Sequence, residues 1–180
     1  MNEAKIVIRP ARAVDAEQIH RLLSAVAEEE GVLIEGPEEI SAEDIRSRIR
    51  NSTNRRNRLF LVAVDDERII GVASLESAPL MALGHIRTLM LVVEHHHRRR
   101  GIGRELARQA VDWARLTPGV HKIEVQLREA NTPGLRLILS LGFTLEGRLR
   151  RHVQVAGGRQ IDDMLLALFV DDPVPAEKAE

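Results

Sequence analysis

The sequence contains no cysteine and no tyrosine, and it has only one tryptophan and three phenylalanines. Without cysteine, the chain can form no disulfide framework, no thiol nucleophile and no thiolate metal ligand. The scarcity of aromatic residues means that the core must be built from aliphatic side chains. No apolar run is long enough to cross a bilayer, and the first residues lack the apolar segment of a secretory signal. We therefore expect a cytoplasmic protein without a membrane partner.

An excess of charge of either sign is also lacking. Lysine and arginine number 26 and aspartate and glutamate 27, which gives a formal net charge of -1. The chain as a whole has no electrostatic attraction to nucleic acid, so we expect no nucleic-acid partner. Its 180 residues suffice for one domain with a substantial core. We assign residues 1–170 to a single domain and the acidic, proline-containing residues 171–180 to a flexible tail.

Hydrophobic periodicity predicts an α/β (α+β) fold, in which a mixed sheet is covered by helices on both faces. The spacing of Asp15 and Gln18 is typical of a capping box, and Thr132 before Pro133 predicts another helix start. Strands are expected at residues 6–9, 59–64, 69–76, 84–93 and 120–127 and in a terminal hairpin from 143 to 170, and helices are expected to begin near Asp15, Ser41, Gly101 and Thr132.

The segment from Thr88 to Arg115 predicts an anion site, because an apolar run leads through a basic loop into an amphipathic helix. The glycines Gly101 and Gly103 remove side chains, so that backbone N–H groups can approach a phosphate. The start of the helix adds the positive end of its dipole. Four arginines add positive charge at the same place: Arg98, Arg99, Arg100 and Arg104. The loop therefore suits a ligand with clustered negative charges, such as a pyrophosphate.

Other phosphate and metal motifs do not fit this segment. The loop lacks the Gly-Lys-Ser/Thr end of a P-loop, and no G-x-G-x-x-G occurs in the chain. The three consecutive histidines His95, His96 and His97 cannot all face one ion from a regular strand, and no ligand with supporting spacing accompanies them. We therefore expect no metal site.

The spacing Arg98-x-x-Gly101-x-Gly103 resembles the acetyl-CoA signature Q/R-x-x-G-x-G/A of the GNAT superfamily of N-acetyltransferases. Residues 120–146 resemble the second acetyl-CoA motif of that family, with Asn131 followed by a short helix and a Leu-Gly-Phe triplet. The closing segment is similar to a branch that acetylates amino acids, polyamines and protein N-termini. Its matching positions are Gly142, Phe143, Glu146, Gly147, Arg150, Gly158 and Asp162.

The resemblance covers about residues 5–170 and implies a mostly antiparallel sheet of about seven strands with about four helices on both faces. It also implies that acetyl-CoA is the co-substrate, with its pantetheine arm paired to one strand like a further strand. The implied acetyl-CoA contacts are Leu91, Val92, Val93, Arg98, Arg99, Arg100, Gly101, Ile102, Gly103, Arg104, Asn131, Gly134 and Leu137.

The positions at which the family carries its catalytic acid and base are matched incompletely. Many family members use a tyrosine in the last helix to protonate the leaving thiolate, and the matching residue here is Ile138. The positions that often carry a base correspond to Arg87 and Leu89, and neither is a useful base. We consider Glu76 and His85 as candidate catalytic bases, because both lie at ends of strands near the signature.

Three hypotheses follow. The first is an acetyl-CoA-dependent N-acetyltransferase that acts on a small amine, an amino acid or a peptide N-terminus by direct attack. The second, motivated by Ile138, is an acyl-CoA-binding module with little or no turnover. The third is an ATP- or GTP-binding protein, against which the missing Lys-Ser/Thr pair argues. The resemblance also implies a homodimer formed through the closing strands.

Overall fold

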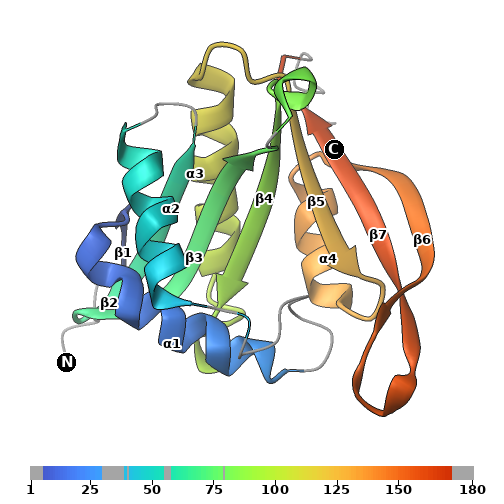
Figure 1. Ribbon diagram of the computed structural model, residues 1–180, viewed down its shortest axis with the longest axis horizontal. Coiled ribbons are helices and arrows are strands. Elements are labelled where there is room, and N and C mark those ends of the chain that lie inside the picture. Colours follow the sequence, from blue (N-terminus) through green and yellow to red (C-terminus); the bar gives the residue numbers. More distant parts are fainter. Residues whose placement is uncertain (1–5, 30–38, 40, 55–57, 79, 172–180) are drawn as a thin grey trace, which may run out of the picture.

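The computed structural model describes residues 6–29, 39, 41–54, 58–78 and 80–171. Over these ranges it confirms the expected fold class, with seven strands in one sheet and four α-helices (Figure 1). The strands are β1 (Val7–Pro10), β2 (Leu59–Asp65), β3 (Arg68–Ser77), β4 (Ile86–Val93), β5 (Lys122–Arg128), β6 (Thr144–Gln154) and β7 (Gln160–Phe169). The α-helices are α1 (Ala16–Ala27), α2 (Ala42–Asn54), α3 (Ile102–Leu116) and α4 (Thr132–Ser140).

The sheet is mostly antiparallel and has the strand order β1-β2-β3-β4-β5-β7-β6. Only the pair β4 and β5 is parallel among the described strands. The expected hairpin of β2 and β3 turns through Asp66 and Glu67, both of which have positive φ, at 42° and 68°. A turn of that kind matches the right-handed twist of the two strands. The expected terminal hairpin is β6 and β7.

The helices form a layer on each side of the sheet. Apolar residues of α1 and α2 pack against β2, β3 and β4 on one face, which we call the α1/α2 face. The other, the α3/α4 face, carries α3 and α4 (Figure 1). The largest fully buried side chains are isoleucines, leucines and valines, as the shortage of aromatic residues requires. No helix within the described ranges is both long enough and apolar enough to cross a membrane.

Two predicted helix starts differ from the structure. Asp15 makes no side-chain cap for α1, and Gln18 accepts a hydrogen bond from the Ile69 N–H instead of closing a capping box. Asn131, not Thr132, is the cap of α4, because its side-chain oxygen accepts the Gly134 N–H at 3.0 Å. Of the expected tail, only Asp171 lies inside the described residues.

Candidate active site

The two parallel strands β4 and β5 separate after a short paired stretch. Their register comprises three pairs, of which the last joins Thr88 to Glu124. Beyond this pair β4 continues to Val93 and β5 to Arg128, and the two strands diverge with α4 behind them (Figure 1). We call this arrangement the β4–β5 fork, with the pair Thr88 and Glu124 as its apex. Where the two parallel strands diverge, the edge of β4 that faced β5 has no strand partner, and its backbone groups are open to a ligand.

The open edge of β4 carries the peptide groups of Leu91 and Val93. The Glu94 N–H donates to the Ile70 carbonyl of β3 at 2.9 Å. Hydrogen-bonded and non-bonded pairs alternate along an antiparallel ladder, so Val92 bonds with β3 while its neighbours face the fork. The side chains of Leu91 and Val93 pack toward α3, on the α3/α4 face. β4 is therefore held by β3 on one edge, and its other edge presents the N–H and carbonyl of Leu91 and the N–H of Val93, while the Val93 carbonyl accepts a hydrogen bond from Arg98.

The basic loop lies at the end of β4 and leads into α3. It begins with a 3-10 turn over His95–His97 and ends at Gly101, which caps α3 with a φ of 81°. The loop's own bonds use the N–H groups of His97 and Arg98. In the described part of the chain, no turn, loop or cap bond uses the N–H groups of residues 99–104. A helix start with free N–H groups is a site for an anion.

Gly103 brings three elements of the fork together. A Cβ at this position would lie 3.3 Å from the Leu137 side chain of α4 and 3.6 Å from Val93 of β4. Arg104 on the next position donates to the Ser140 hydroxyl of α4 at 3.0 Å. The first turn of α3 therefore packs directly on α4, which closes the fork from the α3/α4 face. The structure thus brings together Val93, Gly103, Arg104 and Leu137, all expected from the sequence to contact acetyl-CoA.

The arginines of the loop differ in their contacts. Arg98 is engaged within the protein, by Glu29 after α1 and by the carbonyl of Val93. Arg99 and Arg100 are exposed, and Arg99 adopts a positive φ of 64°. Among the described residues, neither forms an ion pair. The mobile positive charge of the loop is therefore that of Arg99 and Arg100, with Arg104 beside them.

Two histidines of the run lie close to carboxylate groups. His97 lies 2.5 Å from Glu94 and 3.7 Å from Asp65, and Glu94 also pairs with Arg68. His95 lies 3.7 Å from Glu29. No cluster of three or more potential metal ligands is formed by the residues that the structure describes.

Of the two candidate bases, Glu76 lies level with the fork apex and His85 lies before it along the chain. Glu76 pairs with Thr88 in the β3–β4 register, and its carboxylate accepts two hydrogen bonds from Arg48 of α2, with Arg58 3.8 Å away. His85 is exposed and precedes β4, and its carbonyl accepts the N–H groups of His121 and Lys122. His85 therefore lies three residues before the apex, at the end of β4 away from the basic loop.

Sequence reasoning missed a third candidate base, the carboxylate of Glu124 at the apex. Ile123 and Val125 pack on the α3/α4 face, so the alternation of β5 turns Glu124 to the opposite face, where Thr88 also points. Glu124 lies 2.8 Å from Lys122, which also contacts Glu146 of β6 at 2.8 Å. Glu124 is identified by the register of β4 and β5, and a single sequence does not contain this register.

Ile138 is the residue that the resemblance to the family implied would be matched to a tyrosine. Its side chain is 2% exposed and packs with α3, β5 and β7 in the core. No hydroxyl of this helix position is therefore available to protonate a thiolate. The buried position explains why an aliphatic residue is stable there.

The sheet divides after three parallel pairs, and the helix α3 begins at the end of β4 with N–H groups that the loop itself does not use. The model of the acetyltransferase (GNAT) family matches residues 17–143 of this chain. The chain therefore belongs to the GNAT acetyltransferase family.

Individual relatives agree with this assignment. The probable N-acetyltransferase YjcK of Bacillus subtilis is 27% identical over 176 residues, which are 93% of this chain and 96% of the relative. The GNAT acetyltransferase structure from Streptococcus pneumoniae has a TM-score of 0.86 at 22% identity and covers 92% of this chain and 99% of its own. Structurally similar too is yncA, a putative acetyltransferase of Salmonella typhimurium solved with acetyl-CoA. Its TM-score is 0.84 at 20% identity, over 97% of this chain and 99% of its own.

The residues of the fork fit acetyl-CoA, the co-substrate of the family. The free N–H groups at the start of α3 suit a pyrophosphate, and Gly101 leaves open space beside them, whereas Gly103 lets α3 pack closely on Leu137 and Val93. The open edge of β4 offers peptide groups to an amide-containing arm. These features arise from backbone conformation, which is why the match does not depend on a particular side chain.

Proposed function

We propose that the protein transfers an acetyl group from acetyl-CoA to a primary amine, which belongs to a small amine, an amino acid or a peptide N-terminus. The amine nitrogen attacks the thioester carbonyl carbon, the C–S bond breaks, and the CoA thiolate takes up a proton. The observation that carries the proposal is the combination of the β4–β5 fork with the free N–H groups at the start of α3. The absence of cysteine supports direct attack.

The contacts proposed for acetyl-CoA divide between its two parts. Residues 99–104 hold the pyrophosphate through backbone N–H groups, and the peptide groups of Leu91 and Val93 pair with the pantetheine arm. Gly134 and Leu137 of α4 line the arm from the other side. Asn131 acts through the cap that it forms on α4. Arg98 orders the loop through Glu29 and Val93.

Transfer also requires that the ammonium group of the acceptor lose a proton, since a lysine-like amine has a pKa of about 10. Glu76 and His85 are the bases proposed from the sequence, and the register of the fork adds Glu124. Glu124 is favoured because it lies at the apex and contacts a single cation, Lys122, whereas the Glu76 carboxylate is held by Arg48 and also lies 3.8 Å from Arg58.

The candidates are separated by the variants E76Q, H85Q and E124Q. The variant that removes the base loses about 100-fold or more of kcat together with the acidic limb of the pH–rate profile. The two other variants keep the shape of the profile. If all three keep it, the base is water and none of these side chains has the proposed role.

Turnover itself is tested by thiol release. Purified protein is incubated with acetyl-CoA and a panel of amines, amino acids and peptides with free N-termini, and free CoA is measured against a control without amine. Release that depends on one acceptor class supports the transferase. Thermal stabilisation by acetyl-CoA without release for any acceptor favours the binding module suggested by Ile138. Stabilisation by ATP with magnesium and none by acetyl-CoA would overturn both.

We also infer a homodimer that forms through the closing strands. Among the described strands, β6 pairs only with β7, so its outer edge has no strand beside it there, and Leu145 on it is exposed. An exposed edge strand is a template for pairing with a second chain. Sedimentation of the protein and of a variant with Pro at Leu149 tests this inference. A monomeric native protein contradicts it.

A further inference from the structure

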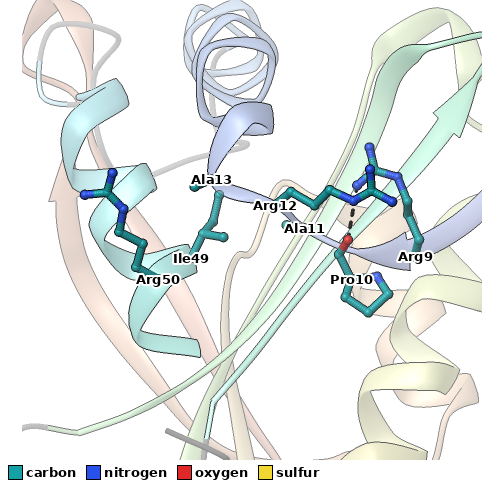
Figure 2. Close-up of a pocket in the computed structure, with 7 residues that line it drawn as sticks. All are labelled: Arg9, Pro10, Ala11, Arg12, Ala13, Ile49 and Arg50. Carbon is teal, nitrogen blue, oxygen red and sulfur yellow. Dashed lines mark hydrogen bonds between the residues drawn. The ribbon is translucent and has the colours of Figure 1, made fainter. Parts of the chain in front are cut away.

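A pocket of about 560 Å³ lies at the edge of the sheet where β1 ends and α2 packs. Figure 2 shows Arg9 and Arg12 on the β1 side of this pocket and Arg50 on the α2 side, with Ala13 and Ile49 between them. The lining is completed by Pro10 and Ala11. Pockets of several hundred cubic ångströms are of the size that binds small organic ligands.

The pocket has more positive than negative charge. Arg9 donates two hydrogen bonds to Asp15, at 2.7 and 2.9 Å, so its guanidinium is neutralised and fixed. The backbone N–H of Arg12 bonds to the same carboxylate. In the described ranges, neither the Arg12 nor the Arg50 guanidinium forms an ion pair. Three guanidinium groups thus surround the pocket, and among the described residues beside them only the Asp15 carboxylate offsets their charge, so the pocket carries an excess of positive charge.

The surface between the arginines is apolar. Ala11 and Ile49 are buried, and Pro10 and Ala13 extend this surface toward the rim. Guanidinium groups match the planar or tetrahedral arrangement of carboxylate and phosphate oxygens, and they bind these groups through two parallel hydrogen bonds. An apolar floor beneath such groups favours an anion attached to a hydrocarbon or ring over a free inorganic ion.

This pocket lies apart from the β4–β5 fork. β1 is three strands from β4, a separation of about 14 Å across the sheet. The arginines of the basic loop line neither the pocket nor the β1 edge. We propose that the pocket bounded by Arg9, Arg12 and Arg50 binds a small organic oxyanion, a phosphate or carboxylate with an apolar part, at the same time as the fork binds acetyl-CoA.

The test uses the full chain with saturating CoA, so that the fork is occupied. Phenyl phosphate, benzoate and inorganic phosphate are titrated separately by calorimetry. The proposal expects one-to-one binding of phenyl phosphate or benzoate, at least several-fold tighter than inorganic phosphate. The R12Q/R50Q double variant is expected to lose this binding by 10-fold or more and to bind CoA like the native chain. Arg9 is left unchanged, because Asp15 would otherwise remain buried without its partner.

The matched control is R21Q/R115Q, which removes two exposed arginines elsewhere on the surface. It separates a defined site from a general effect of net charge, and it is expected to bind the probes like the native chain. The proposal is overturned if neither organic probe binds in the presence of CoA. It is equally overturned if R12Q/R50Q binds them normally, or if the control loses binding to the same extent. These outcomes do not depend on acetyl transfer.

Discussion

Arg98, the first arginine of the acetyl-CoA signature, is paired with Glu29 directly after α1. Its two terminal nitrogens donate to the two carboxylate oxygens at 2.6 and 2.8 Å, and its Nε donates to the Val93 carbonyl at 2.9 Å. One side chain therefore joins the end of α1, the end of β4 and the basic loop. The signature arginine acts here as a structural link, and we propose that its neighbours in the loop contact the phosphates.

This link predicts that Glu29 and Arg98 contribute to stability as a unit. A partly buried, charge-assisted pair of this kind is worth about 1 kcal/mol after solvent screening. In a chain of this size, E29Q and R98Q should each lower the unfolding midpoint by about 3 °C. The double variant should be no less stable than R98Q alone, since both changes remove one interaction. Additive losses in thermal unfolding would contradict the pairing.

The variant R104Q is the matched control for E29Q and R98Q. Arg104 is exposed and donates only to Ser140 among the described residues, so its loss should leave the midpoint nearly unchanged. We expect it to weaken acetyl-CoA binding several-fold, because its charge lies at the free start of α3. Calorimetric titration with acetyl-CoA measures this effect.

Substitution of Gly101 in the basic loop should affect acetyl-CoA binding as well as stability, and the two effects can be measured separately. Gly101 has a φ of 81°, and a Cβ there would meet no atom within 4 Å. G101A should therefore cost about 1 kcal/mol from its backbone conformation alone. It should also reduce stabilisation by acetyl-CoA, because the added methyl group would lie where we propose that a phosphate approaches the N–H groups. Thermal shift with and without acetyl-CoA measures both effects.

Gly119 provides the control for this change. It follows α3 at its other end with a φ of 80°, and a Cβ there would also meet nothing within 4 Å. G119A should have the same cost in stability as G101A and leave the shift produced by acetyl-CoA intact. Equal loss of the shift in both variants would show that the effect comes from strain and not from the binding site.

Local patterns in the sequence determine much of this fold. The order of strands and helices, the hairpins and the anion loop follow from periodicity, from glycine positions and from helix starts. The segment after Thr88 is readable because its strand, loop and helix are adjacent in the chain, so the site that they form is local. The residues of the fork around Gly101 and Gly103 are therefore among those that the sequence alone can predict.

The parts that the sequence could not predict depend on contacts between distant segments. Gln18 bonds to Ile69 of β3, and Asp15 bonds to Arg9 of β1, so neither residue forms the local capping box that its spacing suggests. To locate the apex at Thr88 and Glu124, one must know where β4 and β5 separate. That point depends on sheet twist and on the packing of α4, which short-range patterns do not encode.

The buried ion pair of Arg128 and Asp163 predicts a large loss of stability when one partner is removed. The two side chains are 2% and 0% exposed and join the end of β5 to β7, where Gln126 also donates to Asp163. D163A leaves a buried guanidinium without its partner and should cost about 3–5 kcal/mol in denaturant unfolding.

The double variant R128M/D163L tests the origin of that cost. It replaces both charges by apolar side chains, and it should recover most of the stability that D163A loses. If D163A is nearly neutral, or if the double variant is as unstable as D163A, the cost does not come from an unpaired buried charge. Urea unfolding at pH 7 decides between these results.

Asp15 predicts a specific dependence of stability on pH. Burial raises the pKa of its carboxyl group, but the hydrogen bonds from the Arg9 guanidinium and the Arg12 N–H outweigh this effect and hold the pKa below its usual value. The unfolded chain therefore takes up the proton first as the pH falls. The contribution of Asp15 is fully present above the unfolded pKa of about 4 and is lost as the pH falls through the lower folded value.

The test compares the free energy of unfolding of the native chain and of D15N between pH 7 and pH 3. The difference should be constant from pH 7 to about pH 5 and should shrink below about pH 4. Glu105 titrates in the same acid range, because hydrogen bonds from Arg108 and Gln109 lower its pKa to about 2. It is present in both proteins, so its contribution cancels in the difference. A difference that grows as the pH falls would mean that the carboxyl pKa is raised by folding and that burial outweighs the bonds to Arg9 and Arg12.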